Sequence, residues 1–354
     1  MTRPHRAPWL LLCCLVVLLG AACEPPEYES SQPIDEAGSA QRPQGLDNKE
    51  AESASIGDPS ADATWVASEA GLDARAEKLR ISMVDVGQGD GFVVEFPNGK
   101  VLVVDGGPST TKLANHLASR GITQIDYAVL SHGHHDHYTG LTPVLSLLPK
   151  GCAPRVFDPG LNRRDVAGYN SFRSAAGCNY QAVRGGSTLL IDPAVEVSVL
   201  AAHDKRVGSS DDSHGINNTS VVLRIRYGRF SILFEGDAES EAERLTYDSS
   251  RSFLRSTVLK AGHHGSCTST AGSYLAAVAP QYVLISVSET NSYGMPHCQT
   301  MAKLKARSGL RWVRTDENGT VRLASDGVRY SVSRAKGRES EDSCPRDCAS
   351  PQDF

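Results

Sequence analysis

The sequence predicts an α/β (α+β) domain in which two β-sheets pack together and helices cover their outer faces. Strand-like segments follow one another at the start of the body of the chain, residues 78–335, and strand–helix pairs come later. β-Branched runs such as Val93-Val94 and Val103-Val104 stand between glycines and prolines, as is typical of buried strands. This order of elements favours two sheets with helices outside.

The expected elements follow from apolar periodicity and from breaker residues. Strands are expected over residues 79–86, 91–96, 100–105, 125–131, 195–201, 219–226, 230–235, 257–261 and 281–287. Helices are expected over residues 111–119, 239–247 and 271–278. Gly319 and Gly327 separate the last strands.

The composition is that of a soluble globular protein, with 40% hydrophobic and 22% charged residues among 354. Its length suits one large domain or two small ones. The formal net charge of −5 gives no basic excess that would indicate a nucleic-acid surface. A local patch can still override the net charge.

The N-terminus has the pattern of an export signal. Basic residues precede an apolar run over residues 9–19, and small residues then lead to Cys23. The run is too short for a comfortable transmembrane helix. We therefore expect residues 1–23 to be a signal peptide, with either a lipidated Cys23 that holds the protein at a cell membrane or outer membrane, or ordinary cleavage and a secreted or periplasmic protein.

Two polar segments flank the body of the chain. Residues 24–77 are rich in Glu, Ser, Pro and Gln and have few large apolar residues, so they are expected to be a disordered tether. Residues 336–354 form a polar tail that contains two cysteines, Cys344 and Cys348.

Six cysteines follow the signal segment, which suggests disulfide bonds in an oxidising compartment. Sequence alone does not determine their pairing. Proximity along the chain favours Cys152 with Cys178 and Cys344 with Cys348, the latter a clip in the tail. That choice leaves Cys267 with Cys298.

The densest chemical signal is the run of residues 131–137, Ser-His-Gly-His-His-Asp-His, which follows an apolar strand. Imidazole nitrogens and carboxylate oxygens bind zinc and related ions. Residues two apart in an extended segment point the same way, so His132 and His134 can share one metal. Asp136 and His137 can reach a second metal, whereas His135 is expected to face away.

Two later segments end strands with further ligand types. Phe-Glu-Gly-Asp at residues 234–237 presents Asp237, whose two oxygens can bridge two metals, although a turn or helix cap would explain it equally well in isolation. Gly-His-His-Gly-Ser at residues 262–266 offers a ligand for the second metal. His263 is preferred as that ligand, and His264 is expected to contact substrate or to orient a ligand.

Carboxylates near the start of the body have two readings each. Asp105 ends a strand below the histidine run and either orients a ligand or serves a turn. Asp85 and Asp90 flank a glycine loop whose backbone either approaches a phosphate or makes a strained turn.

The run His132, His134, Asp136 and His137 resembles the metal-binding loop of the metallo-β-lactamase superfamily. The resemblance implies a four-layer αββα sandwich with two metals at one edge, bridged by Asp237. The surrounding segments, residues 85–90, 217–223 and 291–297, narrow the resemblance to the metallo-hydrolase domain of ComEC-type competence proteins and their secreted relatives, over nearly all of residues 79–333.

The sequence departs from that pattern in two places. The family supplies a further histidine to the first metal before the bridging aspartate, where this chain has an Asn-rich segment; His203 and His214 are the nearby candidates. Relatives of the ComEC type read Tyr-Gly-His-Pro where this chain has Met295, and His297 is expected to take a substrate role.

These features predict a dinuclear metal-dependent hydrolase. Two metals lower the pKa of a bridging water, which makes hydroxide available near neutral pH. Asp136 or Asp237 is expected to hold the proton of the nucleophile, and Lys260, His264, Ser266 or His297 to stabilise the leaving group or the developing negative charge.

Phosphodiesters, in nucleic acid or in a small headgroup, are the substrates that the resemblance favours. A lactone, ester or β-lactam hydrolase on the same site is the alternative, and a silent metal-binding surface module is another. Zinc is the expected metal, with manganese or iron as alternatives. The natural substrate and the oligomeric state stay open, and no protein partner is inferred.

Overall fold

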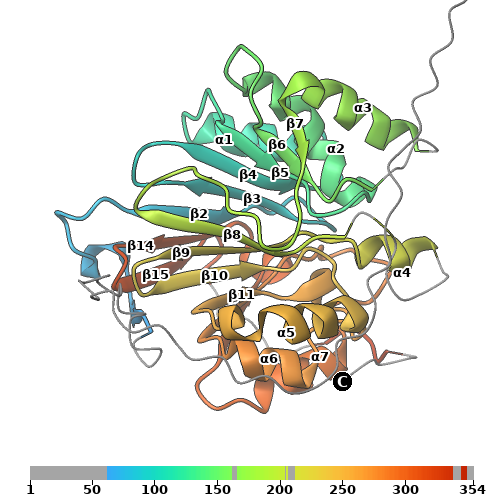
Figure 1. Cartoon of the computed structure of the whole chain (residues 1–354). Helices are drawn as coiled ribbons and strands as arrows, with labels where there is room; N and C mark the ends of the chain where they lie inside the picture. The colour runs from blue at the N-terminus through green and yellow to red at the C-terminus, as the bar shows by residue number, and fades with distance from the viewer. Residues whose placement is uncertain (1–61, 162–165, 204, 206–211, 338–343, 349–354) are drawn as a thin grey trace, which may run out of the picture. The chain divides into compact units, whose positions relative to one another are not determined.

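The strands form two sheets that face each other (Figure 1). The computed structural model describes residues 62–161, 166–203, 205, 212–337 and 344–348. One sheet has nine strands in the order β1-β15-β14-β2-β3-β4-β5-β6-β7, and the other has six in the order β13-β12-β11-β10-β9-β8.

The nine-stranded sheet contains β1 (Thr64–Val66), β2 (Leu79–Met83), β3 (Gly91–Glu95), β4 (Val101–Gly106), β5 (Tyr127–Val129), β6 (Val156–Asp158), β7 (Tyr180–Ala182), β14 (Val321–Ser325) and β15 (Arg329–Arg334). The six-stranded sheet contains β8 (Val195–Ala201), β9 (Val222–Tyr227), β10 (Phe230–Phe234), β11 (Val258–Lys260), β12 (Tyr282–Ile285) and β13 (Arg311–Arg314). The α-helices are α1 (Lys112–Ser119), α2 (His135–Val144), α3 (Ala167–Ala176), α4 (Asp212–Asn217), α5 (Ser240–Leu254), α6 (Gly272–Val278), α7 (Cys298–Lys305) and α8 (Thr315–Asn318).

Helices lie on the outer face of each sheet. Helices α1, α2 and α3 cover the nine-stranded sheet, and α5, α6 and α7 cover the six-stranded sheet (Figure 1). Three hydrophobic clusters match the three interfaces between these layers, one between the sheets and one beneath each set of helices. The predicted αββα sandwich is therefore confirmed.

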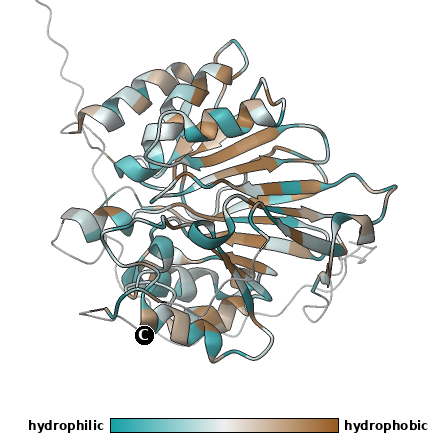
Figure 2. Ribbon diagram, turned by 180° about the vertical axis from the view of Figure 1, so that it is seen from behind, coloured by the Kyte–Doolittle hydropathy of each residue, from teal (hydrophilic) through white to brown (hydrophobic). Residues whose placement is uncertain are grey.

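Strand β3 shows why the inner strands are apolar on both faces. Phe92 and Val94 pack into the cluster between the sheets, whereas Val93 packs with Leu113 and Leu141 of the helices outside. Successive side chains of a strand point to opposite faces, so a strand that is covered on both sides has a continuous apolar run. Figure 2 shows this run as hydrophobic colour along the strands of the layered sheets.

The predicted tether is wrong at its C-terminal end. Residues 64–66 form β1, which pairs in parallel with β15, and Trp65 packs its ring 4.1 Å from the guanidinium of Arg311. Residues 1–61, including the predicted signal and Cys23, lie outside the described residues. Among the residues that the structure describes, no helix combines the length and the apolar character needed to cross a bilayer.

Several elements were not expected from the sequence. Strands β6 and β7 have only three residues each, too few to show a period. Helix α2 begins at His135, inside the histidine run, where a loop was expected. Asp136 lies in the first turn of this helix, a position that the helix dipole favours for a negative charge.

The disulfide bonds correct two of the three expected pairs. Cys152 pairs with Cys178 as expected, but Cys267 pairs with Cys348 and Cys298 pairs with Cys344. The predicted clip between Cys344 and Cys348 is therefore wrong, because each of these cysteines faces a different segment of the body.

Residues 344–348, the C-terminal strap, lie against the start of α7. The N–H of Cys298 donates to the carbonyl of Arg346 at 3.0 Å, and the N–H of Cys348 donates to the side chain of Gln299 at 2.9 Å. The strap thus joins the start of α7 to the segment that contains Cys267, directly after the His-His-Gly-Ser motif.

Replacing Cys267 and Cys348 together by serine is expected to lower the free energy of unfolding by about 2–4 kcal/mol, since the disulfide restricts the unfolded chain. It is also expected to weaken metal binding, because Cys267 adjoins the loop of His263 and His264. Urea unfolding and metal titration measure the two effects. The Cys152→Ser/Cys178→Ser variant is the control: it should lose stability without losing metal affinity. Equal loss of metal affinity in both variants would contradict the expectation.

Candidate metal centre

The candidate centre lies where strands of both sheets end. The segment after β5 carries His132 and His134, the segment after β10 carries Asp237, and the segment after β11 carries His263 and His264. Since β5 belongs to one sheet and β10 and β11 to the other, the sandwich brings the three segments together at one edge.

His132 is buried and presents one nitrogen to the centre. Its Nδ1 lies 3.0 Å from the hydroxyl of Ser131, and its Nε2 lies 3.0 Å from Nδ1 of His134. Burial, together with the nearby His137, holds the pKa of His132 well below its usual value. The imidazole is therefore neutral, which is the form that binds metals. His135 faces solvent with 71% of its side chain exposed, as expected.

Asp105 orients His137 from below. One carboxylate oxygen lies 2.9 Å from Nδ1 of His137, and the other accepts the N–H of Ser131 at 2.7 Å. This leaves Nε2 of His137 facing the centre, 3.2 Å from Oδ2 of Asp237. A carboxylate that holds the outer nitrogen of a ligating histidine fixes both its ring and its tautomer. The structure thus supports the orienting role of Asp105.

Asp237 is the common point of the centre. Four histidines place Nε2 within 3.2–3.9 Å of its Oδ2: His132, His137, His263 and His264. Burial alone raises the pKa of Asp237, but His264 and His137 outweigh it and lower that pKa well below its usual range. The carboxylate is therefore ionised. This position, directly after Gly236 with its φ of 55°, fits the expected bridging role.

His264, rather than His263, belongs to the group that includes Asp136, His137 and Asp237. One ligand atom from each of these four residues lies within 4.8 Å of all the others. Nδ1 of His264 donates to the carbonyl of Ser286 at 3.0 Å, which leaves Nε2 facing Asp237. The sequence preferred His263 for this group and expected His264 to contact substrate or to orient a ligand, whereas the geometry places His264 in the group. The backbone conformation at the two histidines decides which of them joins the group, and the sequence pattern does not reveal that conformation.

His297 does not reach the centre. Its Nδ1 accepts the N–H of Cys267 at 3.0 Å, and its Nε2 donates to the carbonyl of Tyr293 at 3.2 Å. Both ring nitrogens are occupied by backbone groups, so the expected catalytic role is corrected to a structural one. His297 holds two loops together beside the centre.

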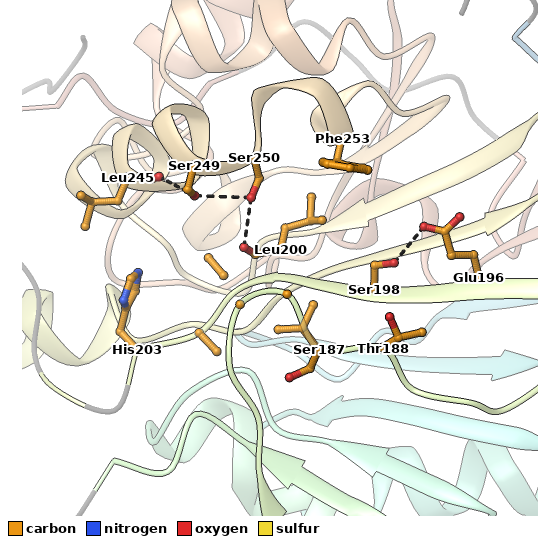
Figure 3. Close-up of a pocket in the computed structure, with 15 residues that line it drawn as sticks. Ser187, Thr188, Glu196, Ser198, Leu200, His203, Leu245, Ser249, Ser250 and Phe253 are labelled. Carbon is orange, nitrogen blue, oxygen red and sulfur yellow. Dashed lines mark hydrogen bonds between the residues drawn. The ribbon is translucent and has the colours of Figure 1, made fainter. Parts of the chain in front are cut away.

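The two candidates for the missing histidine also lie elsewhere. His214 places Nδ1 on the carboxylate of Glu239. His203 lines a pocket of about 620 Å³ between β8 and α5, which includes none of the metal-centre residues. Figure 3 shows His203 at one end of this pocket and Phe253 toward the other.

Lys260 and Asp90 form a buried ion pair beside the centre. Their Nζ and Oδ2 atoms are 2.5 Å apart, and neither side chain is more than 2% exposed. Nζ of Lys260 also donates to the carbonyl of Gly236 at 2.7 Å and lies 3.7 Å from Oδ1 of Asp237. Lys260 therefore positions the carboxylate of Asp237, and its burial removes it from contact with a leaving group. Sequence reasoning missed this pairing because the two residues lie 170 positions apart.

The chemistry of the buried atoms fits a pair of divalent cations. Nε2 of His264 and Oδ1 of Asp237 are buried and make no hydrogen bond within the described residues. Buried polar atoms in native proteins normally have partners, so these atoms indicate a missing ligand. Nitrogen and carboxylate donors in this number suit zinc and similar ions. Asp136, His137, Asp237 and His264 would hold one cation, and His132 with His134 would hold the other.

The glycine loop at residues 85–90 packs against the centre. A Cβ placed on Gly89 would lie 2.2 Å from the carbonyl oxygen of Asp136, and the φ of Gly89 is 142°. The close approach and the backbone conformation explain the glycine. Asp85 faces outward, with its side chain 3.9 Å from Lys112. The loop thus supports the metal-binding segment.

Replacing Gly89 by alanine is expected to displace Asp136 and to weaken metal binding by about 10–100-fold, the loss typical of disturbed ligand positioning. Metal titration by calorimetry measures it. Gly99→Ala is the matched control, because Gly99 also has a positive φ, of 81°, but a Cβ placed there would meet no described atom within 4 Å. An unchanged affinity in Gly89→Ala would show that the close approach is unimportant.

Comparison with known proteins gives the same family. The model of the metallo-beta-lactamase superfamily matches residues 84–288, more than half of the chain and all of the centre. The chain belongs to this superfamily. Its members typically bind divalent metals, in agreement with the ligand groups described above.

Curated relatives of the chain include two proteins with names from competence systems. ComE operon protein 3 of Bacillus subtilis is 30% identical over 267 residues, which cover 68% of this chain and 32% of that protein. Competence protein ComA of Neisseria gonorrhoeae is 28% identical and covers 70% of this chain and 33% of its own length. The chain thus spans about a third of the length of these relatives.

Among solved structures, the chain is similar to the metallo-beta-lactamase fold protein YhfI from Bacillus subtilis. It is 14% identical, with a TM-score of 0.44, and the alignment covers 67% of this chain and 96% of that one.

Proposed function

We propose that the chain is a hydrolase that depends on two divalent metal ions, with zinc preferred, and that it cleaves phosphodiesters. The observation that supports this most directly is the convergence of four imidazole nitrogens on Oδ2 of Asp237. A second pair of donors, on His132 and His134, lies beside it. When bound, two such ions act as Lewis acids and lower the pKa of water.

Asp136 and Asp237 differ in exposure, and we assign them different roles in the reaction. Asp136 has 20% of its side chain exposed, whereas Asp237 has 2%. Burial alone raises the pKa of Asp136, but His137 and His264 lower it far below its usual range. Asp136 is therefore the more exposed, ionised acceptor that orients a water molecule, while the carboxylate of Asp237 is buried.

Activity on bis-p-nitrophenyl phosphate tests this proposal, with zinc or manganese supplied to metal-free protein. We expect metal-dependent release of nitrophenol and its loss in His134→Ala. His135→Ala is the control, because His135 faces solvent and should keep the activity. No turnover with either metal would overturn the phosphodiesterase proposal. Turnover of a lactone or nitrocefin alone would favour the alternative hydrolase on the same site.

We also propose that the protein is exported and attached to a membrane through lipidated Cys23. Three disulfide bonds among the described residues support an oxidising compartment. Radiolabelled palmitate should enter the wild-type protein and the Cys14→Ser variant, but not Cys23→Ser. Recovery of the protein from the cytosol with free thiols would overturn the proposal.

A further inference from the structure

The first metal position has too few histidines. His132 and His134 offer two imidazoles, and the superfamily pattern expects one more from the segment before the bridging aspartate. In this chain that segment is Asn-rich; His203 lines the pocket between β8 and α5, and Nδ1 of His214 contacts Glu239. With a shared Asp237 this position has three protein ligands, and a fourth donor from another element would complete the tetrahedral set that zinc prefers.

His263 is placed to be that donor. Its Nε2 lies 3.9 Å from Oδ2 of Asp237, so it faces the same point as the other ligands. Its Nδ1 lies 3.4 Å from Oε1 of Glu239 and 3.4 Å from the hydroxyl of Thr268. One nitrogen toward the metal and the other toward a carboxylate is the usual arrangement of a ligating histidine.

Glu239 is itself held in place by the Asn-rich segment. Its side chain is fully buried, and it accepts a hydrogen bond from Asn217 at 2.8 Å and contacts His214. Its backbone N–H donates to the side chain of Asn218 at 2.9 Å. The segment that lacks the superfamily's ligand therefore positions the carboxylate that orients His263.

The backbone separates the roles of the two adjacent histidines. His263 and His264 have φ values of 46° and 56°, and two successive non-glycine residues in the left-handed region are uncommon. Such a conformation costs of order 1–3 kcal/mol per residue and persists where the surroundings require it. It brings both imidazoles to Asp237 with their rings 5.9 Å apart.

We propose that the two histidines are divided between the two ions. His264 serves the ion held by Asp136 and His137, and His263 completes the ligands of the ion held by His132 and His134. Glu239 is a positioning residue that acts through His263. This inference rests on the proposed dinuclear site and names the replacement for the missing histidine.

The number of zinc ions bound per chain, in single and double variants, tests which histidine serves which ion. Mass spectrometry of protein dialysed against zinc measures this number. Wild type should hold two ions per chain, and His132→Ala and His263→Ala should each hold one. The double variant His132→Ala/His263→Ala should still hold one, since both residues serve the same ion. His132→Ala/His264→Ala should hold none. A double variant His132→Ala/His263→Ala without metal, or His263→Ala with two ions bound as tightly as in wild type, would overturn the proposal.

The positioning role of Glu239 is tested by one variant and a matched control variant. Glu239→Gln should weaken binding of one ion by about 10–100-fold, while Glu196→Gln, a carboxylate that pairs with Arg226 on the surface, should leave both affinities unchanged. Circular dichroism confirms that each variant is folded, and the absorption spectrum of the cobalt-loaded protein reports the lost imidazole. Equal affinities in the two variants would reject the role of Glu239. These readouts need no turnover, so a failure of the hydrolase proposal is distinguishable from a failure of this one.

Discussion

Asp237→Asn is expected to reduce the bound metal from two ions to at most one and to lower kcat/KM on a phosphodiester by more than 100-fold. The carboxylate oxygen that four imidazoles face would be shared by both metal positions. Asparagine keeps the size of the side chain but removes its negative charge and its ability to bridge two cations. The expected loss exceeds the roughly 10–100-fold effect of disturbing a residue that only orients a ligand.

Metal content and steady-state kinetics measure the two effects on the same protein sample. Asp192→Asn is the matched control, because Asp192 is also a buried aspartate, but it accepts backbone N–H groups of Asn98 and Ala194 in another part of the domain. It should keep both ions and full turnover. Two tightly bound ions in Asp237→Asn, with activity within tenfold of wild type, would show that the bridging role is wrong.

The largest effect on stability is expected for Lys260→Met. This change leaves the buried carboxylate of Asp90 without its ammonium partner, and breaking a buried ion pair in this way costs about 3–5 kcal/mol. Burial alone lowers the pKa of Lys260, but Asp90 outweighs burial and raises it, so the pair is charged in the folded protein. Urea unfolding with a chelator present measures the loss, because metal binding then contributes no stability.

Two further variants test whether the loss of stability comes from the buried ion pair between Lys260 and Asp90. The double variant Asp90→Asn/Lys260→Met should be less destabilised than the sum of the single changes, because it removes both buried charges. Lys112→Met is the control: its ion pair with Asp85 is 3.9 Å long and largely exposed, so its loss should cost less than about 1 kcal/mol. Equal losses in Lys112→Met and Lys260→Met would show that burial does not strengthen this pair.

The parts of the site that were predictable have local causes. Residues 131–137 place ligand types directly after an apolar strand, and Asp237 follows Gly236 at the end of a later strand. Both positions follow from strand periodicity and the position of strand ends. The long helices and strands were predictable for the same reason, since an apolar period of a few residues is visible along the chain.

The parts that were missed depend on contacts between distant residues. The choice between His263 and His264 depends on two positive φ values, which no local pattern shows for histidine. Glu239 resembles an ordinary residue at the start of a helix, and only its fold partners give it another role. Strand β1 has three residues and pairs with a strand more than 250 positions later. Pairing of the cysteines is equally non-local, with separations of 46 and 81 residues.

The C-terminal strap has a consequence for the order in which the protein is made. Ribosomes build a chain from its N-terminus, so Cys348 emerges after every residue of both sheets and 81 residues after its partner Cys267. The bond beside the metal loop therefore closes only on a chain whose strands have all been synthesised. A chain released before residue 344 retains both sheets, yet its metal loop lacks this covalent anchor. The strap thus makes this covalent link to the site depend on translation through Cys348.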